Sequence, residues 1–249
     1  GMTPLSAAST GPSSDIVQLL LANNADVNKT TYNGETALWQ ASEMAHSDVV
    51  EILLANNADV NKPNDDGKQQ LKESPREPYS GYTALYIASY EGHSDIVQLL
   101  LANNADVNYA NIHGETPLKV ATKKGHDNIA QLLREKIADV NKADNDRQTP
   151  LCVASKENHS DVVELLLADN ADVNEIDSEG ATPLWWASWN GNNVVAQLLL
   201  ANNADVNKAN KYNQTPLYIA IQQEHSDVAQ LLLANNADVN QGRVQQSGL

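Results

Sequence analysis

Five of the six histidines recur at one position of a repeating pattern, and a series of histidines can bind metal. They are His46, His93, His126, His159 and His225. Zinc ligands must all lie about 2 Å from one ion, whereas packed helices that repeat along a stack lie about 8–10 Å apart. A hydrogen bond near the start of a helix explains one histidine per repeat better than a shared ion does. The sequence therefore predicts no metal site.

Cys152 is the only cysteine, and a thiol beside a histidine can act as a nucleophile. Such catalysis also needs a third group that orients the base. The pattern places no such group near Cys152, and it contains no glycine-rich loop for an oxyanion or a phosphate. We therefore expect no catalytic residues, no cofactor and no enzymatic activity. A single cysteine also excludes an intramolecular disulfide and suits a reducing compartment.

These residues belong to a repeating pattern, marked by the stretch LLLANNADVN. Copies of this stretch, some with substitutions, recur along the whole chain. The spacing between copies is 33 residues, except for one step of 47, as shown by the closing asparagines Asn28, Asn61, Asn108, Asn141, Asn174, Asn207 and Asn240. A period of this size indicates a repeat array. We expect one elongated domain over residues 1–249, with repeats at 3–28, 29–61, 62–108, 109–141, 142–174, 175–207 and 208–240 and a tail at 241–249.

Repeat three shows how each unit should fold. Thr83 is a favoured N-cap, so the first helix should run from there to Gly92, which can adopt the left-handed conformation. Ser94 should cap the second helix, and Asn103 and Asn104 should end it. Helices this short are marginal alone and must stack. The shared core should contain the leucine two residues, and the alanine five residues, after each repeat's threonine: Leu5, Leu38, Leu85, Leu118, Leu151, Leu184, Leu217, and Ala8, Ala41, Ala88, Ala121, Ala154, Ala187, Ala220.

The order Thr-Pro-Leu-x-x-Ala, then Gly92-His93 or Gly125-His126, then the leucine run and Ala-Asp-Val-Asn, resembles the ankyrin repeat. The resemblance covers residues 3–240. It implies an all-α solenoid of stacked helix-turn-helix units with β-turn fingers, used for protein–protein binding. The histidine that usually follows Thr-Pro-Leu in the family is replaced in every repeat, by Ser6, Trp39, Tyr86, Lys119, Cys152, Trp185 and Tyr218.

Two repeats depart from the common length or pattern. Repeat three has 14 extra residues between Asn61 and Thr83, rich in charge, proline and glycine, which predict an enlarged finger. In repeat four, Ile137 stands where other repeats have the asparagine that closes the second helix. A β-branched residue in the left-handed conformation should be strained there.

The net charge of -16, from 32 acidic and 16 basic residues, would repel nucleic acids and anionic membranes at long range. Many of the acids occupy cap and turn positions, so the charge is weaker evidence about partners than its size implies. No apolar stretch approaches the roughly 20 residues that span a bilayer, and the given N-terminus lacks the apolar run of a secretory leader. We expect a soluble, cytoplasmic monomer that binds neither nucleic acid nor membrane.

The chain has no phenylalanine but keeps four tryptophans and eight tyrosines. Positions three and seven after each threonine lie on one face of the first helix, and they hold Trp39, Tyr86, Tyr90, Trp185, Trp189 and Tyr218. The fingers that border this face in the ankyrin fold hold Tyr32, Tyr79, Tyr82 and Tyr212. Positive charge is added to the same face by Lys119, Lys123 and Lys156. We interpret these thirteen residues as the binding site for a partner with apolar or aromatic anchors that flank an acidic or polar centre. For Trp186 we expect a role in covering the core.

Three functions fit this sequence. The first is a non-catalytic module that binds a protein or peptide partner in the concave groove of the resembled fold. The second is a passive structural spacer, in which the aromatic residues share no ligand. The third is a substrate-recruiting domain of a larger multidomain protein. A specific partner that is lost on mutation of the groove aromatics would separate the first from the second.

Overall fold

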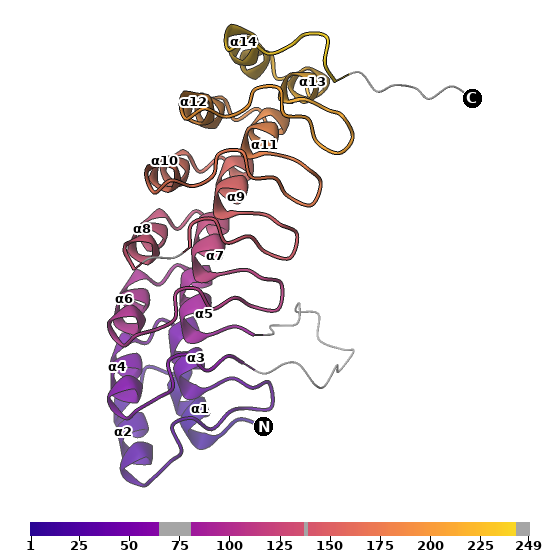
Figure 1. Cartoon of the computed structure of the whole chain (residues 1–249). Helices are drawn as coiled ribbons and strands as arrows, with labels where there is room; N and C mark the ends of the chain where they lie inside the picture. Colours follow the sequence, from indigo (N-terminus) through magenta and orange to yellow (C-terminus); the bar gives the residue numbers. More distant parts are fainter. Residues whose placement is uncertain (65–80, 137–138, 243–249) are drawn as a thin grey trace, which may run out of the picture. The chain divides into compact units, whose positions relative to one another are not determined.

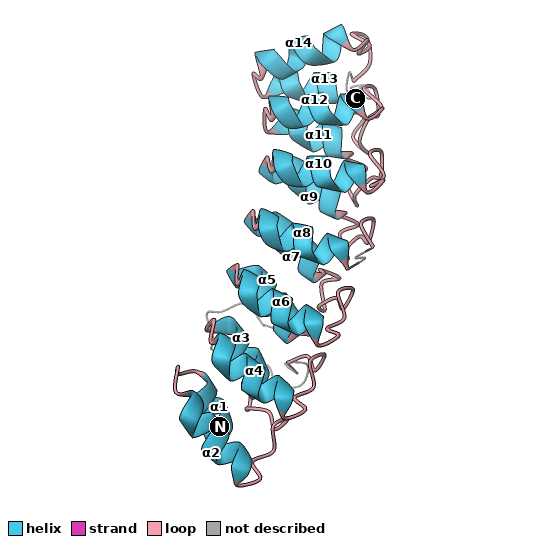
Figure 2. Cartoon of the chain, turned by 90° about the vertical axis from the view of Figure 1, so that its left-hand side faces the viewer, coloured by secondary structure: helices cyan, strands magenta, loops and turns pink. Residues whose placement is uncertain are grey.

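The computed structural model describes residues 1–64, 81–136 and 139–242. Within these residues every repeat forms a pair of short helices joined by loops, and no strand is present, as Figure 2 shows. The chain divides into two compact units, Gly1–Ala138 and Asp139–Leu249. The all-α class is confirmed. The single array of seven repeats stays a prediction.

The first unit contains repeats one to four. The first helices of its repeats pack in order against one another, and so do the second helices, which gives two layers (Figure 1). The first helices are α1 (Pro4–Ser9), α3 (Ala37–Glu43), α5 (Ala84–Glu91) and α7 (Pro117–Lys124). The second helices are α2 (Ser14–Ala22), α4 (Ser47–Ala55), α6 (Ser94–Ala102) and α8 (Asp127–Glu135). The fingers project from the layer of first helices.

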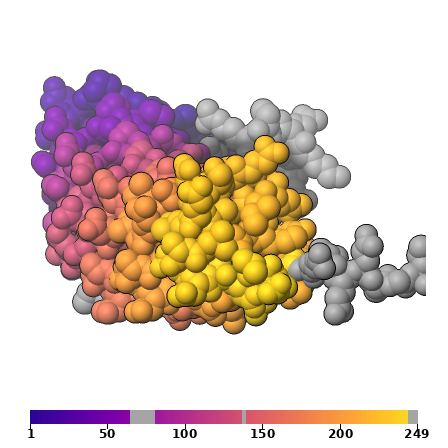
Figure 3. All heavy atoms as spheres, turned by 90° about the horizontal axis from the view of Figure 1, so that it is seen from above, coloured from indigo at the N-terminus to yellow at the C-terminus, as the bar shows by residue number. Residues whose placement is uncertain are grey.

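The second unit contains repeats five to seven in the same arrangement. Its first helices are α9 (Pro150–Glu157), α11 (Pro183–Trp189) and α13 (Pro216–Gln222). Its second helices are α10 (Ser160–Ala168), α12 (Asn193–Ala201) and α14 (Ser226–Ala234). Seen from the C-terminal end in Figure 3, the last repeat (yellow) lies over the earlier repeats of this unit (orange).

The expected caps are found on the first helices but not on the second. Thr83 caps α5, with its hydroxyl accepting a hydrogen bond from the Tyr86 amide, and every first helix starts with a threonine used in the same way. The prediction that Ser94 caps α6 was wrong. The N-cap is His93, which makes no side-chain capping bond, and Ser94 is the first helical residue. The imidazole of His93 instead reaches the preceding repeat, as described below.

Left-handed residues end the helices as the sequence predicts. Gly92 has a φ of 88° at the end of α5. The second helices are followed by an asparagine with φ between 62° and 66° in every described case, namely Asn24, Asn57, Asn104, Asn170, Asn203 and Asn236. Asparagine tolerates this conformation better than most residues, which explains its recurrence. Ile137 lies outside the described residues.

The predicted core positions are buried in both units. All seven leucines that follow the threonines are at most 5% exposed, and so are six of the seven alanines. Ala8 is the exception, because it belongs to repeat one and is only partly buried. The small alanine allows the first helices of neighbouring repeats to pack closely, and the leucine fills the space between the two layers.

The recurrent asparagine of Ala-Asp-Val-Asn bonds to the next repeat at five positions, namely Asn28, Asn61, Asn141, Asn174 and Asn207. In the first unit, Asn61 accepts a hydrogen bond from the Asp106 amide at 2.7 Å and donates one to the Asn104 carbonyl at 3.5 Å. In the second unit, Asn174 accepts a bond from the Asp205 amide at 2.8 Å. A side-chain amide can satisfy a backbone donor and a backbone acceptor at once. This explains why the asparagine returns in every repeat.

The fingers are closed by backbone hydrogen bonds at their base. In repeat four, Asn111 donates to the Glu115 carbonyl at 3.0 Å and Gly114 donates to the Asn111 carbonyl at 2.9 Å. The same closure is present on both sides of the extra residues, because Asn64 donates to the Tyr82 carbonyl and accepts from the Gly81 amide. The insertion therefore begins and ends at a finger base. Its interior, including Tyr79, lies outside the described residues.

Candidate functional site

Four of the five histidines in the series form hydrogen bonds between repeats. His93 places its Nε2 at 3.0 Å from the Glu43 carbonyl, at the end of the preceding repeat's first helix. His46, His126 and His225 contact the equivalent carbonyls of Thr10, Tyr90 and Trp189 at 3.0–3.2 Å. No group of three metal-ligating side chains comes together within the described residues. These four histidines therefore connect stacked repeats to each other.

Repeat six has Asn192 in place of the histidine, and the contact is retained. Its side-chain amide donates to the Ser155 carbonyl at 2.8 Å and to the Lys156 carbonyl at 3.2 Å. Asn190 also donates to the Lys156 carbonyl, at 2.9 Å. Two amide side chains thus hold the end of α9 against the loop that follows α11.

Cys152 lies in α9 and is 1% exposed. Burial, and next the nearby Asp177 carboxylate, raise the pKa of its thiol to about 12. Because the thiolate is the nucleophilic form, a thiol with this pKa is poorly suited to covalent catalysis near neutral pH. Cys152 is a core residue in the position that other repeats fill with an aromatic or polar side chain.

The predicted binding residues differ widely in exposure. Four of them are buried at 2–5% exposed, namely Trp39, Tyr86, Lys119 and Trp185. Four are partly buried, namely Tyr82, Tyr90, Lys156 and Tyr218. Four are exposed, namely Tyr32, Lys123, Trp189 and Tyr212. Solvent reaches the last two groups, whereas the four side chains of the first group are almost wholly covered.

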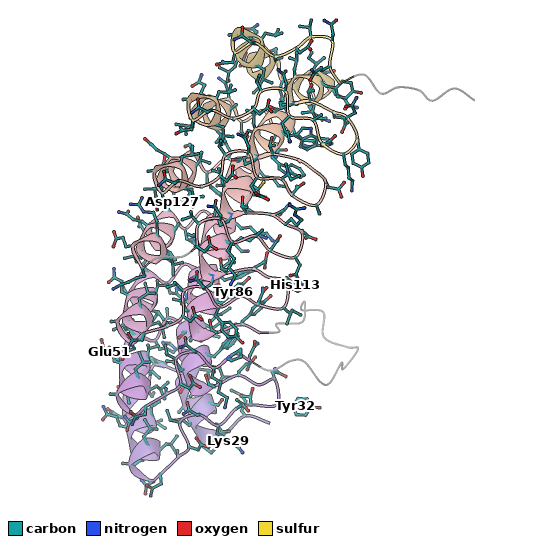
Figure 4. All side chains as sticks on the ribbon, viewed as in Figure 1. Lys29, Tyr32, Glu51, Tyr86, His113 and Asp127 are labelled. Carbon is teal, nitrogen blue, oxygen red and sulfur yellow. The ribbon has the colours of Figure 1, made fainter. Side chains whose placement is uncertain are left out.

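Tyr86, labelled in Figure 4, is 2% exposed and belongs to a buried polar cluster of the first unit. Its ring stacks on Tyr82 with centroids 4.3 Å apart and planes nearly parallel. Its hydroxyl donates to Glu115 at 3.0 Å and accepts from the Asn111 side chain at 3.2 Å. Burial, and next the Glu115 carboxylate, raise the pKa of the phenol far above its ordinary value. The hydroxyl therefore remains a hydrogen-bond donor.

Glu115 is the centre of this cluster. The Nζ atoms of Lys119 and Lys123 lie 3.6 Å and 3.7 Å from its Oε1. Burial alone would raise the pKa of the Glu115 carboxyl, but the two ammonium groups and the hydrogen bonds from Tyr86 and Asn111 hold it below its ordinary value. Two of the three lysines that we expected to face a partner are thus paired with a carboxylate of the protein itself.

The three neighbouring tryptophans form one cluster in the second unit. Trp185 packs with Ala181 and Ile219, and Trp186 covers this group from its edge, as predicted for Trp186. The ring centroids of Trp189 lie 5.2 Å from Trp185 and 6.5 Å from Trp186. Trp189 is 37% exposed. The cluster therefore presents one indole to solvent from a packed base.

Polar contacts fix the two inner indoles. Trp185 donates from Nε1 to the Gln214 carbonyl at 3.1 Å, and Trp186 donates to Asp177 Oδ2 at 2.9 Å. The Lys156 ammonium lies 4.5 Å from the centroid of the Trp186 ring, within the range of a cation–π contact.

The finger residues extend the candidate surface in each unit. Tyr32 is 58% exposed and points outward from its finger, as labelled in Figure 4. Tyr212 is equally exposed, with Lys211 lying 5.2 Å from its ring centroid. Ile112, at 55% exposure, is a further apolar finger residue, which the search for aromatic residues did not include. Its position in the sequence could have identified it, because Ile112 and Tyr32 both lie four residues before the threonine that caps the first helix of their repeat.

Trp39 and Trp185 occupy the same position in their repeats but differ in their indole contacts. The Nε1 of Trp39 is buried and has no hydrogen-bond partner in the described part of the chain. We expect Trp185→Phe to lower the free energy of unfolding by about 1–3 kcal/mol more than Trp39→Phe, because only the first removes a bond and leaves a carbonyl unpaired. Urea unfolding of both variants measures the difference. Equal losses would show that the Gln214 contact contributes nothing.

In each unit, the described residues form stacked helix pairs with aromatic side chains on the first helices and fingers. The family described as ankyrin repeats (3 copies) matches residues 1–64, 66–144, 111–177, 138–210 and 171–243. The chain therefore belongs to the ankyrin-repeat family, which is non-catalytic and generally binds proteins. No curated protein matches the sequence.

The structure is similar to the crystal structure of the human ASB11 ankyrin repeat domain. The TM-score is 0.79 at 26% sequence identity, over 95% of this chain and 99% of that one. In all, 605 chains of solved structures match, so the fold alone does not single out a partner. Within the described residues, no helix is long and apolar enough to cross a membrane.

Proposed function

We propose that this protein is a non-catalytic interaction module that binds a protein or peptide on the face formed by the first helices and the fingers. The observation that supports this most is exposure of 37–58% for Tyr32 on this face of the first unit and for Trp189 and Tyr212 on this face of the second unit. Tyrosine and tryptophan are the residues that most often carry binding energy at protein interfaces. Their rings lose little conformational entropy on binding, since each has only two side-chain torsions.

The buried members of the predicted site support the exposed ones. Tyr86 holds Tyr82 by stacking, and Trp185 holds Trp189 by ring contact. A side chain that is already fixed in the free protein loses less freedom when a partner binds. The buried aromatic residues therefore contribute to recognition indirectly, by restricting the rings above them.

A passive spacer would give these exposed rings no common ligand. A domain that recruits a substrate for a larger protein would use the same surface, and it differs only in what is attached to the chain. Both alternatives predict the same helical stack. The distinguishing property is binding that depends on the exposed aromatic residues.

The test is selection of a random peptide display library on the immobilised whole protein. We expect enriched peptides whose binding weakens at least about tenfold in Tyr32→Ala or in the double variant Trp189→Ala/Tyr212→Ala, since truncation at a hot spot costs about 2 kcal/mol or more. The matched control is Val194→Ala, because Val194 is 56% exposed but lies on the second helix α12. No enrichment, or equal loss in the control, would contradict the proposed function.

A further inference from the structure

Lys156 and Trp189 occupy the same position in successive repeats, seven residues after Thr149 and Thr182, and their helices α9 and α11 pack side by side. We propose that they form a subsite for an acidic peptide segment. A side-chain carboxylate of the partner pairs with the Lys156 ammonium, and the adjacent apolar side chain packs on the Trp189 indole. This inference rests on the proposed function and names the chemistry of the partner at one place on its face.

Among the three lysines of the predicted site, Lys156 differs in that its ammonium group is not paired with a carboxylate of the described residues. Among the described residues, no ion pair joins its Nζ to an acidic side chain within 4.0 Å. Lys123, at the equivalent position one repeat earlier, is paired with Glu115. In the second unit, Lys211 is paired with Glu179 at 2.6 Å. An ammonium group that forms no ion pair can accept an external carboxylate without breaking an existing ion pair.

The ammonium group is also held in place. The Lys156 carbonyl accepts hydrogen bonds from Asn190 and Asn192, which fix the backbone at the end of α9. The Nζ lies over the Trp186 ring, and the Trp186 indole is itself bonded to Asp177. Lysine ordinarily loses substantial rotamer freedom when it forms an ion pair. Here part of that freedom is already lost in the free protein, which favours binding.

The apolar half of the subsite lies next to the charged half. Trp189 contacts the same Trp186 ring that Lys156 covers, with ring centroids 6.5 Å apart. A carboxylate and a neighbouring apolar side chain on one peptide can therefore contact Lys156 and Trp189 together. Neither half alone would be selective, because exposed ion pairs and exposed rings are each weak sites.

The charge of the whole protein limits which acidic segments can bind. A net charge of -16 repels a strongly acidic partner at long range, although salt screens this repulsion beyond about 8–10 Å. The contact between Lys156 and one carboxylate acts at short range. The partner segment should therefore carry one acidic residue beside an apolar residue, without further acids nearby.

The test uses three blocked hexapeptides added to the whole ¹⁵N-labelled protein: Ac-GSEFGS-NH2, Ac-GSQFGS-NH2 and Ac-GSKFGS-NH2. The reported signal is the Trp189 indole N–H, assigned with Trp189→Phe. We expect the Glu peptide to shift this signal and to bind about fivefold more tightly than the Gln peptide, the gain of one exposed ion pair. The Lys peptide should bind more weakly than both. Lys156→Met should abolish the preference for Glu over Gln, whereas the matched variant Lys123→Met should retain it.

Equal or tighter binding of the Lys peptide, or a Glu preference that survives in Lys156→Met, would overturn the subsite. Tighter binding of Ac-GSGF with a free C-terminus than of the Glu peptide would also overturn the subsite. It would show that Lys156 pairs with a terminal carboxylate and not with an acidic side chain. Peptides from the library selection that depend on Trp189 but show no acidic preference would refute the subsite and leave the proposed function standing. Failure of both the library and the hexapeptides would refute both.

Discussion

Replacing Glu115 by alanine is expected to lower the free energy of unfolding by about 3 kcal/mol. Removing one partner of a buried ion pair typically costs about 3–5 kcal/mol, because the other charge loses its partner in a poorly solvated place. The lower end applies here, since the Glu115 side chain is 16% exposed while that of Lys119 is 3% exposed. The Tyr86 hydroxyl and the Asn111 amide lose an acceptor in the same variant. Urea unfolding followed by circular dichroism measures the change.

Glu179→Ala is the matched control, because it also removes a carboxylate paired with a lysine. The Glu179–Lys211 contact is shorter, at 2.6 Å, but both side chains are 45% exposed. Exposed ion pairs contribute little to stability, since water solvates both charges when the pair is broken. Little change is therefore expected. If Glu179→Ala lowered the free energy of unfolding as much as Glu115→Ala, burial would not explain the contribution of the Glu115 cluster to stability.

The same cluster predicts a dependence of stability on pH. The pKa of Glu115 is lowered in the folded protein, so the unfolded chain binds this proton more readily. The contribution of Glu115 is present above the ordinary glutamate pKa of about 4.3 and is lost as pH falls through its folded value. Glu115→Gln, which cannot ionise, should show a shallower loss of stability over this acid range. A slope identical to that of the unmodified protein would contradict the assignment.

The sequence predicted the elements that depend on local rules. Thr83 and its equivalents cap the first helices, the asparagines equivalent to Asn104 adopt the left-handed conformation, and the recurrent leucines are buried, because each follows from backbone geometry or from the period. The role of the histidines was predicted only in part. A bond near the second helix was expected, but its acceptor lies in the preceding repeat, and only the stacking geometry shows this.

The candidate site was predicted less completely than the fold. Spacing placed Trp185 and Trp189 on one helix face, yet one is buried and the other exposed, because the next repeat covers Trp185 with Ile219. The spacing also predicted that Lys123 and Lys156 occupy equivalent positions on the first helices of their repeats. Only the structure shows that Glu115 neutralises the first of them. Exposure and pairing depend on contacts between repeats, which a single repeat's sequence does not contain.

Gly92→Ala is expected to lower the free energy of unfolding by about 3 kcal/mol for two separate reasons. Gly92 has a φ of 88°, where a side chain costs roughly 1–2 kcal/mol. A Cβ at this position would also lie 2.7 Å from Cε1 of His126, whose ring is held by its bond to the Tyr90 carbonyl. Forcing this ring aside adds about 1–3 kcal/mol, as overpacking usually does. Gly11→Ala is the control, since its Cβ would meet only the Ala8 carbonyl oxygen at 3.8 Å.

The two contributions can be separated with His126→Ala and the double variant Gly92→Ala/His126→Ala. Ala45 occupies the position of Gly92 in repeat two and adopts a φ of 60°, so the fold accepts an alanine there when the local contacts permit it. If the imidazole causes part of the loss, Gly92→Ala should cost less in the His126→Ala background than in the unmodified protein, with a coupling energy of about 1 kcal/mol or more. Additive losses would mean that the backbone conformation accounts for the whole effect and that the histidine moves aside freely.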